Sequence, residues 1–325
     1  MNEIMRLFPS EMRQAIRLKI GDRWQFLQEI RIRLYHPVEL IFDDKVEWLQ
    51  TIIPKNDEGM YLINQLSEFS LYRMQDELRE GYITVEGGHR VGIAGKVITS
   101  DSKVKAIQNI TFFNIRIAKE KIGSASLILP HVFHQKYLNT LIIGPPQTGK
   151  TTLIRDLTRL IASGTRNIAA KKVGVVDERS EIGASLKGVP QHNLGIRTDV
   201  LDACPKAEGM MMLIRSMSPE VMVVDEIGSR EDISALMEAV NTGVTVICTI
   251  HGRDMMELKK RPSLKPVFEQ QIFDRFIVLD KQGKPGQVGK IFDQNENQLL
   301  QKMGCVTDEV DWSTTFNKHS HHDRL

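Results

Sequence analysis

Cysteine is scarce in this chain, and no two cysteines form a motif. The 325 residues include three cysteines, Cys204, Cys248 and Cys305, which lie far apart and form no C-x-x-C pair. An odd number of widely spaced cysteines does not make the disulfide framework of a small secreted domain, and it gives no ligand set for structural zinc. We therefore expect a protein of a reducing cytoplasm.

A long apolar run is also missing. No segment reaches the ~18 consecutive apolar residues of a membrane-spanning helix, and the first ten residues carry Glu3 and Arg6 in place of a signal-peptide core. Both observations argue against a membrane-inserted or exported chain. We expect the protein to reach a membrane only through partner proteins.

The chain has little net charge. Its 43 basic and 41 acidic residues give a formal net charge of +2. Binding to the phosphate backbone of nucleic acid normally requires a basic stripe, so we expect no nucleic-acid partner. The hydrophobic content of 41% and the charged content of 26% are typical of a folded protein that can bury sizeable cores.

One glycine-rich segment fits the pattern G-x-x-x-x-G-K-[ST] without a mismatch. Its residues, with the threonine that follows, are Gly144, Pro145, Pro146, Gln147, Thr148, Gly149, Lys150, Thr151 and Thr152. An apolar strand precedes the segment and a helical pattern follows it, so backbone N–H groups can turn toward phosphate oxygens at the positive end of a helix. Lys150 would bind the β- and γ-phosphates and the Thr151 hydroxyl would bind Mg²⁺. ATP and Mg²⁺ are the predicted cofactors.

Two acids follow an apolar strand farther along the chain. Residues 221–224 are apolar, and Asp225 and Glu226 come directly after them. In a P-loop fold the carboxyl end of such a strand faces the ligand. We predict that Asp225 holds Mg²⁺ and that Glu226 orients or deprotonates the attacking water.

A second acidic strand end is formed by Asp177, Glu178 and Glu181. Two acidic ends facing one phosphate site would need a cation, which Mg²⁺ supplies. Glu178 is our catalytic candidate in this group. A salt-bridged turn through Arg179 is the alternative.

Three further side chains are candidates for the chemistry. His251 closes the strand at 244–249, where a histidine can sense a γ-phosphate by hydrogen bonding; a purely structural histidine is the alternative. Arg90 and Arg116 lie on predicted strands of the N-terminal part. Either can act as an arginine finger, and ordinary surface arginines are the alternative.

The hydrophobic pattern predicts two kinds of structure in succession. Before residue 122 it predicts an α+β domain with an antiparallel sheet, built from a helix at 2–20 interrupted by Pro9, strands at 29–34 and 37–42, a helix at 57–80, a hairpin of 82–85 with 90–98, and a strand at 114–118 after a polar stretch at 100–110. From residue 140 strands alternate with helices, which favours a parallel sheet with helices on both faces. The predicted strands there are 140–144, 172–177, 221–225 and 244–249, the helices lie near 150–163, 206–217 and 230–242, and an antiparallel pair at 273–280 and 287–293 follows at the sheet edge.

We divide the chain accordingly. Residues 1–122 form an α+β N-terminal domain, 123–138 a linker, 139–312 a P-loop ATPase domain and 313–325 a disordered tail. The predicted fold class is α/β.

The order of the four motifs resembles that of the type II/IV secretion ATPases. A Walker A motif at 144–151, an acidic box at 177–181, a Walker B motif at 221–226 and a histidine box at 249–252 follow one another. Longer phrases, among them 87–92, 114–118, 176–182, 201–209 and 215–220, resemble the stage III sporulation AA family of endospore-forming bacteria. This resemblance covers roughly residues 1–300. The chain departs from the wider group of secretion ATPases in one respect. An arginine follows the Walker B motif in those motors, whereas Ile227 and Gly228 follow Asp225 and Glu226 here.

The resemblance implies a RecA-like P-loop core and an Mg²⁺-dependent ATPase. It also implies a hexameric ring with nucleotide between subunits, which powers or assembles a channel complex of membrane proteins. The location it implies is the mother-cell cytoplasm, at the membrane around the forespore. Two alternatives stay open: an ATP-binding assembly switch with little hydrolysis, and a nucleic-acid-linked P-loop motor.

Overall fold

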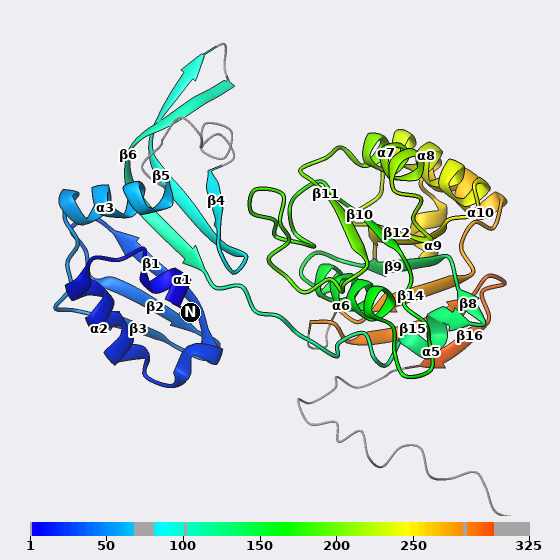
Figure 1. Cartoon of the computed structure of the whole chain (residues 1–325), viewed down its shortest axis with the longest axis horizontal. Helices are drawn as coiled ribbons and strands as arrows, with labels where there is room; N and C mark the ends of the chain where they lie inside the picture. Colours follow the sequence, from blue (N-terminus) through cyan, green and yellow to red (C-terminus); the bar gives the residue numbers. More distant parts are fainter. Residues whose placement is uncertain (1, 68–80, 101–102, 282–284, 302–325) are drawn as a thin grey trace, which may run out of the picture. The chain divides into compact units, whose positions relative to one another are not determined.

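The structure is a computed structural model, and it describes residues 2–67, 81–100, 103–281 and 285–301. The chain forms two compact units (Figure 1). The N-terminal unit comprises Met1–Glu120 and Arg179–Leu194, and the C-terminal unit comprises Lys121–Glu178 and Gly195–Leu325. The contacts therefore group residues 179–194 with the N-terminal unit, although they lie far beyond it in sequence. The predicted tail at 313–325 lies outside the described residues.

The N-terminal unit is built on a six-stranded antiparallel sheet. Its strand order is β3-β2-β1-β6-β5-β4. The elements are α1 (Asn2–Met5), α2 (Ser10–Ile20), η1 (Arg23–Phe26), β1 (Leu27–Arg33), β2 (Val38–Phe42), β3 (Val46–Leu49), α3 (Asn56–Leu66), β4 (Tyr82–Val85), β5 (His89–Ser100) and β6 (Lys103–Arg116). The predicted α+β class of this unit agrees with these elements.

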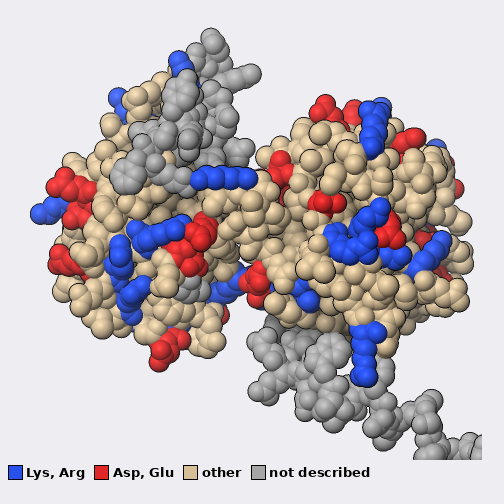
Figure 2. All heavy atoms as spheres, viewed as in Figure 1, with Lys and Arg blue, Asp and Glu red and all other residues tan. Residues whose placement is uncertain are grey.

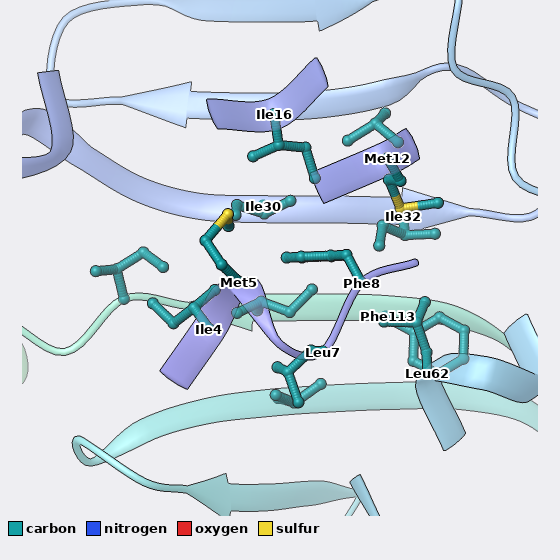
Figure 3. Close-up of a cluster of buried hydrophobic side chains, with 14 of the residues drawn as sticks. Ile4, Met5, Leu7, Phe8, Met12, Ile16, Ile30, Ile32, Leu62 and Phe113 are labelled. Atoms are coloured by element: carbon teal, nitrogen blue, oxygen red, sulfur yellow. The ribbon is translucent and has the colours of Figure 1, made fainter. Parts of the chain in front are cut away.

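One face of this sheet carries the core. Buried residues alternate along β1, and they pair across the sheet with buried residues of β6, as in the pairs Ile30 with Ile115 and Ile32 with Phe113. On α2 the buried residues Met12, Ile16 and Ile20 are four apart and so lie on one side of the helix. Figure 3 shows α2 and the residues before it meeting β1 and β6.

Several predicted boundaries in this unit were wrong. The polar stretch at 100–110 belongs largely to β6, which pairs with β5 along its length. Polar side chains are tolerated there because many residues of 105–112 are partly or fully exposed on both faces of the hairpin. The edge strand β3 was missed. The predicted helix at 57–80 ends at Leu66 as α3, and 68–80 lies outside the described residues.

The C-terminal unit contains a mixed, mostly parallel sheet of eight strands. Its order is β11-β10-β12-β13-β9-β14-β15-β16. The elements are α5 (Leu129–Val132), β7 (Phe133–His134), β8 (Lys136–Tyr137), β9 (Thr140–Gly144), α6 (Lys150–Ser163), β10 (Val173–Asp177), β11 (Thr198–Asp202), α7 (Lys206–Ser216), β12 (Val221–Val224), α8 (Arg230–Asn241), β13 (Thr245–His251), α9 (Met255–Lys259), η3 (Pro262–Leu264), α10 (Lys265–Glu269), β14 (Arg275–Leu279), β15 (Val288–Asp293) and β16 (Gln298–Gln301). No helix among the described residues is both long and apolar enough to cross a membrane.

Helices cover both faces of this sheet, as predicted. Figure 1 shows α7 and α8 on one side and α6 on the other. Neighbouring strands pair in parallel from β11 through β10, β12, β13 and β9 to β14. The pairs β14–β15 and β15–β16 are antiparallel. The edge strands β11 and β16 were not predicted. All five residues of β11 are only partly buried, so its sequence lacks the apolar run of an interior strand.

The chain before β15 packs directly on the loop before α6. The Gly286 N–H donates to the Thr148 carbonyl at 2.8 Å. Gly149, the N-cap of α6, has a φ of 86°. A Cβ on Gly149 would lie 2.4 Å from Gly286 N and 2.9 Å from the Pro285 carbonyl carbon. Glycine is therefore required at position 149 both for its backbone conformation and for this close approach.

The core face of α2 gives a first prediction. Ile16 is fully buried, whereas Leu18, two residues later on the same helix, is 76% exposed. We expect Ile16→Ala to lower the free energy of unfolding by about 2–4 kcal/mol, and Leu18→Ala to change it by less than about 0.5 kcal/mol. Urea denaturation followed by tryptophan fluorescence measures this, because Trp24 and Trp48 both report on the N-terminal unit. Equal losses in the two variants would contradict the packing of α2.

The contact between Gly149 and Gly286 gives a second prediction. Gly243 has the same φ of 86° as Gly149, but a Cβ there would meet nothing within 4 Å. Alanine at either position should cost roughly 1–2 kcal/mol of backbone strain, and Gly149→Ala should cost about 1 kcal/mol more because it collides with backbone. Urea unfolding followed by far-ultraviolet circular dichroism compares the two variants. Equal losses of stability in the two variants would mean that the backbone at 285–286 moves away from the new Cβ at no measurable cost.

Candidate functional site

The predicted phosphate loop lies between β9 and α6, and its own side chains brace it. Thr148 Oγ1 donates to the Pro145 carbonyl at 2.8 Å. A Cβ on Gly144 would lie 2.5 Å from Thr148 Oγ1, so a side chain at this position would have to displace the Thr148 hydroxyl. Lys150 is the first residue of α6 and is only 4% exposed. Its Nζ donates to the Pro145 carbonyl at 3.1 Å.

The structure brings both predicted metal ligands together. Thr151 Oγ1 donates to Asp225 Oδ2 at 2.8 Å. Asp225 directly follows β12, and Thr151 lies in the first turn of α6. The other carboxylate oxygen, Oδ1, accepts from the Thr249 hydroxyl of β13. A hydroxyl and a carboxylate oxygen at one point are hard ligands of the kind that Mg²⁺ prefers.

Glu226 and His251 meet beside these ligands. His251 Nε2 lies 2.7 Å from Glu226 Oε1, and His251 Nδ1 lies 3.1 Å from Lys150 Nζ. Glu226 has a φ of 54°, a left-handed conformation that is uncommon for a residue with a side chain. The bend turns the chain at the end of β12, so that the Glu226 carboxylate meets a residue of the neighbouring strand β13.

Thr249 is a site residue for which we predicted no role of its own. It is fully buried in β13. Its Oγ1 accepts the Glu226 N–H at 2.8 Å and donates to Asp225. A hydroxyl within the buried stretch 246–250, two residues before His251, is the signal that could have identified it. Thr249 thus fixes both acids that follow β12.

The second acidic strand end is divided between different partners. Asp177 is buried at the end of β10, and the exposed Glu178 pairs with Lys206 of α7. Glu181 belongs to the N-terminal unit, where it lies 3.5 Å from Arg90. Glu178 therefore has a salt bridge with Lys206, whereas the alternative interpretation of this acidic group was a turn salt-bridged through Arg179. A catalytic role for Glu178 stays a prediction.

The two candidate arginines differ in their surroundings. Arg90 Nη2 donates to the carbonyls of Arg179 and Ser180 at 2.7 and 2.9 Å, and its guanidinium lies 4.8 Å from the centre of the Tyr82 ring. Arg116 pairs with Arg90 across β5 and β6 but is 66% exposed and 3.8 Å from Glu29. Arg90 is held by residues 179–181, whereas Arg116 has a single distant ion pair among the described contacts. The role of an arginine finger stays a prediction for both.

Neither cysteine that the structure describes belongs to this set of catalytic candidates. Complete burial in β13 raises the pKa of the Cys248 thiol. Burial, with the carboxylates of Glu208 and Glu178, raises the pKa of the Cys204 thiol. Both residues are free thiols, and a raised pKa keeps them protonated and poorly nucleophilic.

The donor set fits a magnesium nucleotide. The loop glycines, the N-terminus of a 14-residue helix and a buried ammonium group suit phosphate oxygens, and Thr151 with Asp225 suits the metal. Within the described ranges there is no group of three or more His, Cys, Asp or Glu side chains that could hold a metal alone. Mg²⁺ does not need such a group, because it commonly takes one or two protein ligands and completes its shell with phosphates and water.

Two solved structures share this fold. The ATPase DotB of Legionella pneumophila aligns with a TM-score of 0.53 and 17% identity, over 90% of this chain and 79% of that one. The pilus retraction motor PilT with bound ADP aligns with a TM-score of 0.55 and 15% identity, over 86% of this chain and 78% of that one. The predicted RecA-like core, preceded by an N-terminal domain, is confirmed.

Sequence comparison extends over almost the whole chain. Stage III sporulation protein AA of Bacillus subtilis (strain 168) is 50% identical over 307 residues, which cover 94% of this chain and 100% of that relative. The family described as Sporulation stage III, protein AA matches residues 1–299. The resemblance drawn from the motifs is therefore confirmed, and the chain belongs to the Sporulation stage III, protein AA family.

Proposed function

We propose that this sporulation protein is an Mg²⁺-dependent ATPase. One observation carries the proposal: Lys150, Thr151, Asp225, Glu226 and His251 meet at one edge of the parallel sheet, in contacts of 2.7–3.1 Å. Each of these residue types has a defined task in phosphoryl transfer, and their order along the chain is that of P-loop ATPases. The ATPase fold of DotB and PilT supports the same conclusion.

In this proposal the loop 144–152 binds the phosphates of ATP. The backbone N–H groups of the loop and the N-terminus of α6 supply positive potential. Lys150, at the first position of α6, adds a full charge for the β- and γ-phosphates. Because Lys150 is buried, little water competes with the phosphates for its charge.

Thr151 and Asp225 hold the magnesium ion, which neutralises charge on the phosphates when bound. Glu226 follows Asp225 directly, so its carboxylate can accept a proton from a water that attacks the γ-phosphate. Thr249 keeps the backbone of Glu226 in place through its hydroxyl. The residue that helps to hold the metal, Asp225, and the residue that accepts the proton, Glu226, are thus neighbours in the chain.

Family membership and the motor fold support the wider part of the proposal. Residues 139–312 act as the ATPase domain of a homo-oligomeric, hexameric ring, and residues 1–122 as a separate N-terminal domain. Arg90 or Arg116 serves as the arginine finger for a neighbouring subunit. The ring works in the mother-cell cytoplasm with membrane proteins of a sporulation channel complex, at the membrane around the forespore, and powers or assembles that complex.

The contact of His251 with Lys150 and Glu226 also favours a second candidate, an ATP-binding switch with little hydrolysis of its own. Both groups needed for turnover are engaged with the same ring. Partner proteins would then be needed to release them. A nucleic-acid motor has no such support, since basic and acidic side chains are interspersed on the face shown in Figure 2.

Lys150→Ala tests the site as a whole. We expect this variant to lose ATP binding and phosphate release, because no other group offers a full positive charge within the loop 144–152. Lys265→Ala is the matched control, since the Lys265 side chain is 70% exposed and its one ion pair among the described residues is with Glu269 at 3.5 Å. Fluorescent-ATP binding and steady-state phosphate release compare the variants with the wild type. ATP hydrolysis at wild-type rate by Lys150→Ala would overturn the site.

Glu226→Gln separates the ATPase from the switch. For an ATPase we expect ATP binding within a few-fold of wild type and phosphate release lower by about 100-fold or more, because the general base is lost. Glu269→Gln on the surface of α10 is the control. Measuring phosphate release with and without the partner membrane proteins completes the test. Wild-type turnover that is negligible without the partner proteins would favour the switch, and loss of ATP binding in Glu226→Gln would assign Glu226 a structural role.

A further inference from the structure

His251 lies between the two most important charges of the site. Its Nδ1 contacts Lys150 Nζ at 3.1 Å and its Nε2 contacts Glu226 Oε1 at 2.7 Å. An ammonium group can only donate hydrogen bonds, so Nδ1 must accept. In the neutral ring the proton then sits on Nε2, the nitrogen that lies 2.7 Å from Glu226 Oε1. One tautomer satisfies both contacts, and the ring links lysine to glutamate in a fixed direction.

The contact with Lys150 competes with a bound phosphate. Lys150 Nζ also donates to the Pro145 carbonyl at 3.1 Å, so the ammonium group is turned toward its own loop and the ring of His251. Phosphate oxygens carry negative charge and form stronger hydrogen bonds with an ammonium group than a neutral imidazole does. A phosphate bound in the loop therefore draws Lys150 away from His251 Nδ1.

The contact with Glu226 holds a residue that is bent away from ordinary geometry. Glu226 has a φ of 54°, a left-handed conformation that is unfavourable for a residue with a Cβ. Two groups of β13 stabilise the bend: the Thr249 hydroxyl accepts the Glu226 N–H, and His251 binds the carboxylate. The position of the carboxylate thus depends on the ring of His251.

We propose that His251 is a positioning residue that couples Lys150 to Glu226. The inference rests on the proposed ATPase function. While the His251 ring accepts a hydrogen bond from Lys150, it also holds the Glu226 carboxylate. When a nucleotide phosphate takes the ammonium group, the ring loses its Nδ1 donor and can rotate, and Glu226 becomes available to the attacking water. The diphosphate portion of the nucleotide is sufficient, because Lys150 reaches the β-phosphate.

This coupling differs from direct sensing of the γ-phosphate by His251. A γ-phosphate sensor stabilises bound ATP and leaves ADP unaffected. In the coupling proposed here His251 competes with either nucleotide for Lys150. Removing the ring should therefore strengthen ADP binding, whereas removing a sensor should weaken ATP binding alone.

The experiment measures the dissociation constants of fluorescent ADP and of a non-hydrolysable ATP analogue. His251→Ala should bind ADP about three- to tenfold more tightly than wild type, since one hydrogen bond to a charged group no longer has to be broken. His251→Asn places an acceptor near the position of Nδ1 and nothing at Nε2, so its ADP affinity should stay within about twofold of wild type. His134→Ala, an exposed histidine on β7, is the control.

A double-mutant cycle tests the link to Glu226. In Glu226→Gln the ring is held less firmly, so adding His251→Ala should tighten ADP binding less than it does alone. Additive effects overturn the coupling. Weaker binding of the ATP analogue with unchanged ADP binding also overturns it and favours the sensor, and weaker binding of both nucleotides assigns His251 a structural role. A wild-type protein that binds neither nucleotide would overturn the proposed function itself.

Discussion

The site depends on the register of three neighbouring parallel strands. Strand β13 lies between β12 and β9, and its pairing places His251 beside Gly144 and Cys248 beside Val224. Because parallel strands end at the same edge of a sheet, residues that follow Val224 must meet Thr249 and His251. A shift of β13 by one residue would move His251 to the other face and break the contacts that Thr249 and His251 make with the site.

The polar groups at this edge contact one another, and two of them lie in the interior. Lys150 and Thr249 are almost or fully buried, and each has partners within the site. Unpaired polar groups would be costly there, so the contacts fix the positions of the side chains. The same arrangement means that a ligand must exchange these contacts for its own. In the proposed ATPase, such a site would link binding of a phosphate to rearrangement of the candidate catalytic groups.

Sequence patterns predicted much of the fold because buried apolar residues recur with the period of the helix or strand that they belong to. The alternation of apolar strands and helices after residue 140 predicted the parallel sheet, and the pattern at 2–20 predicted a helix in the region of α2. Predictions failed where burial is partial: β3, β11 and much of β6 carry too few buried apolar residues to be distinguished from loops. The grouping of 179–194 with the N-terminal unit has no local signal, because it depends on contacts such as that of Arg90 with the Ser180 carbonyl.

The sequence by itself determined which residues match the phosphate-loop pattern and which acids follow the apolar strand. Glycines at 144 and 149, a lysine at 150 and a threonine at 151 have that meaning in any strand-loop-helix context, because the constraint on them is local. Tertiary structure alone decided that Thr249 fixes both acids, that Lys150 and Glu226 share His251, and that Arg90 binds the chain at 179–181. These contacts join residues 23 to 101 positions apart. The physical reason is that strand register and the path of long connections are set by packing over the whole unit, which no local pattern encodes.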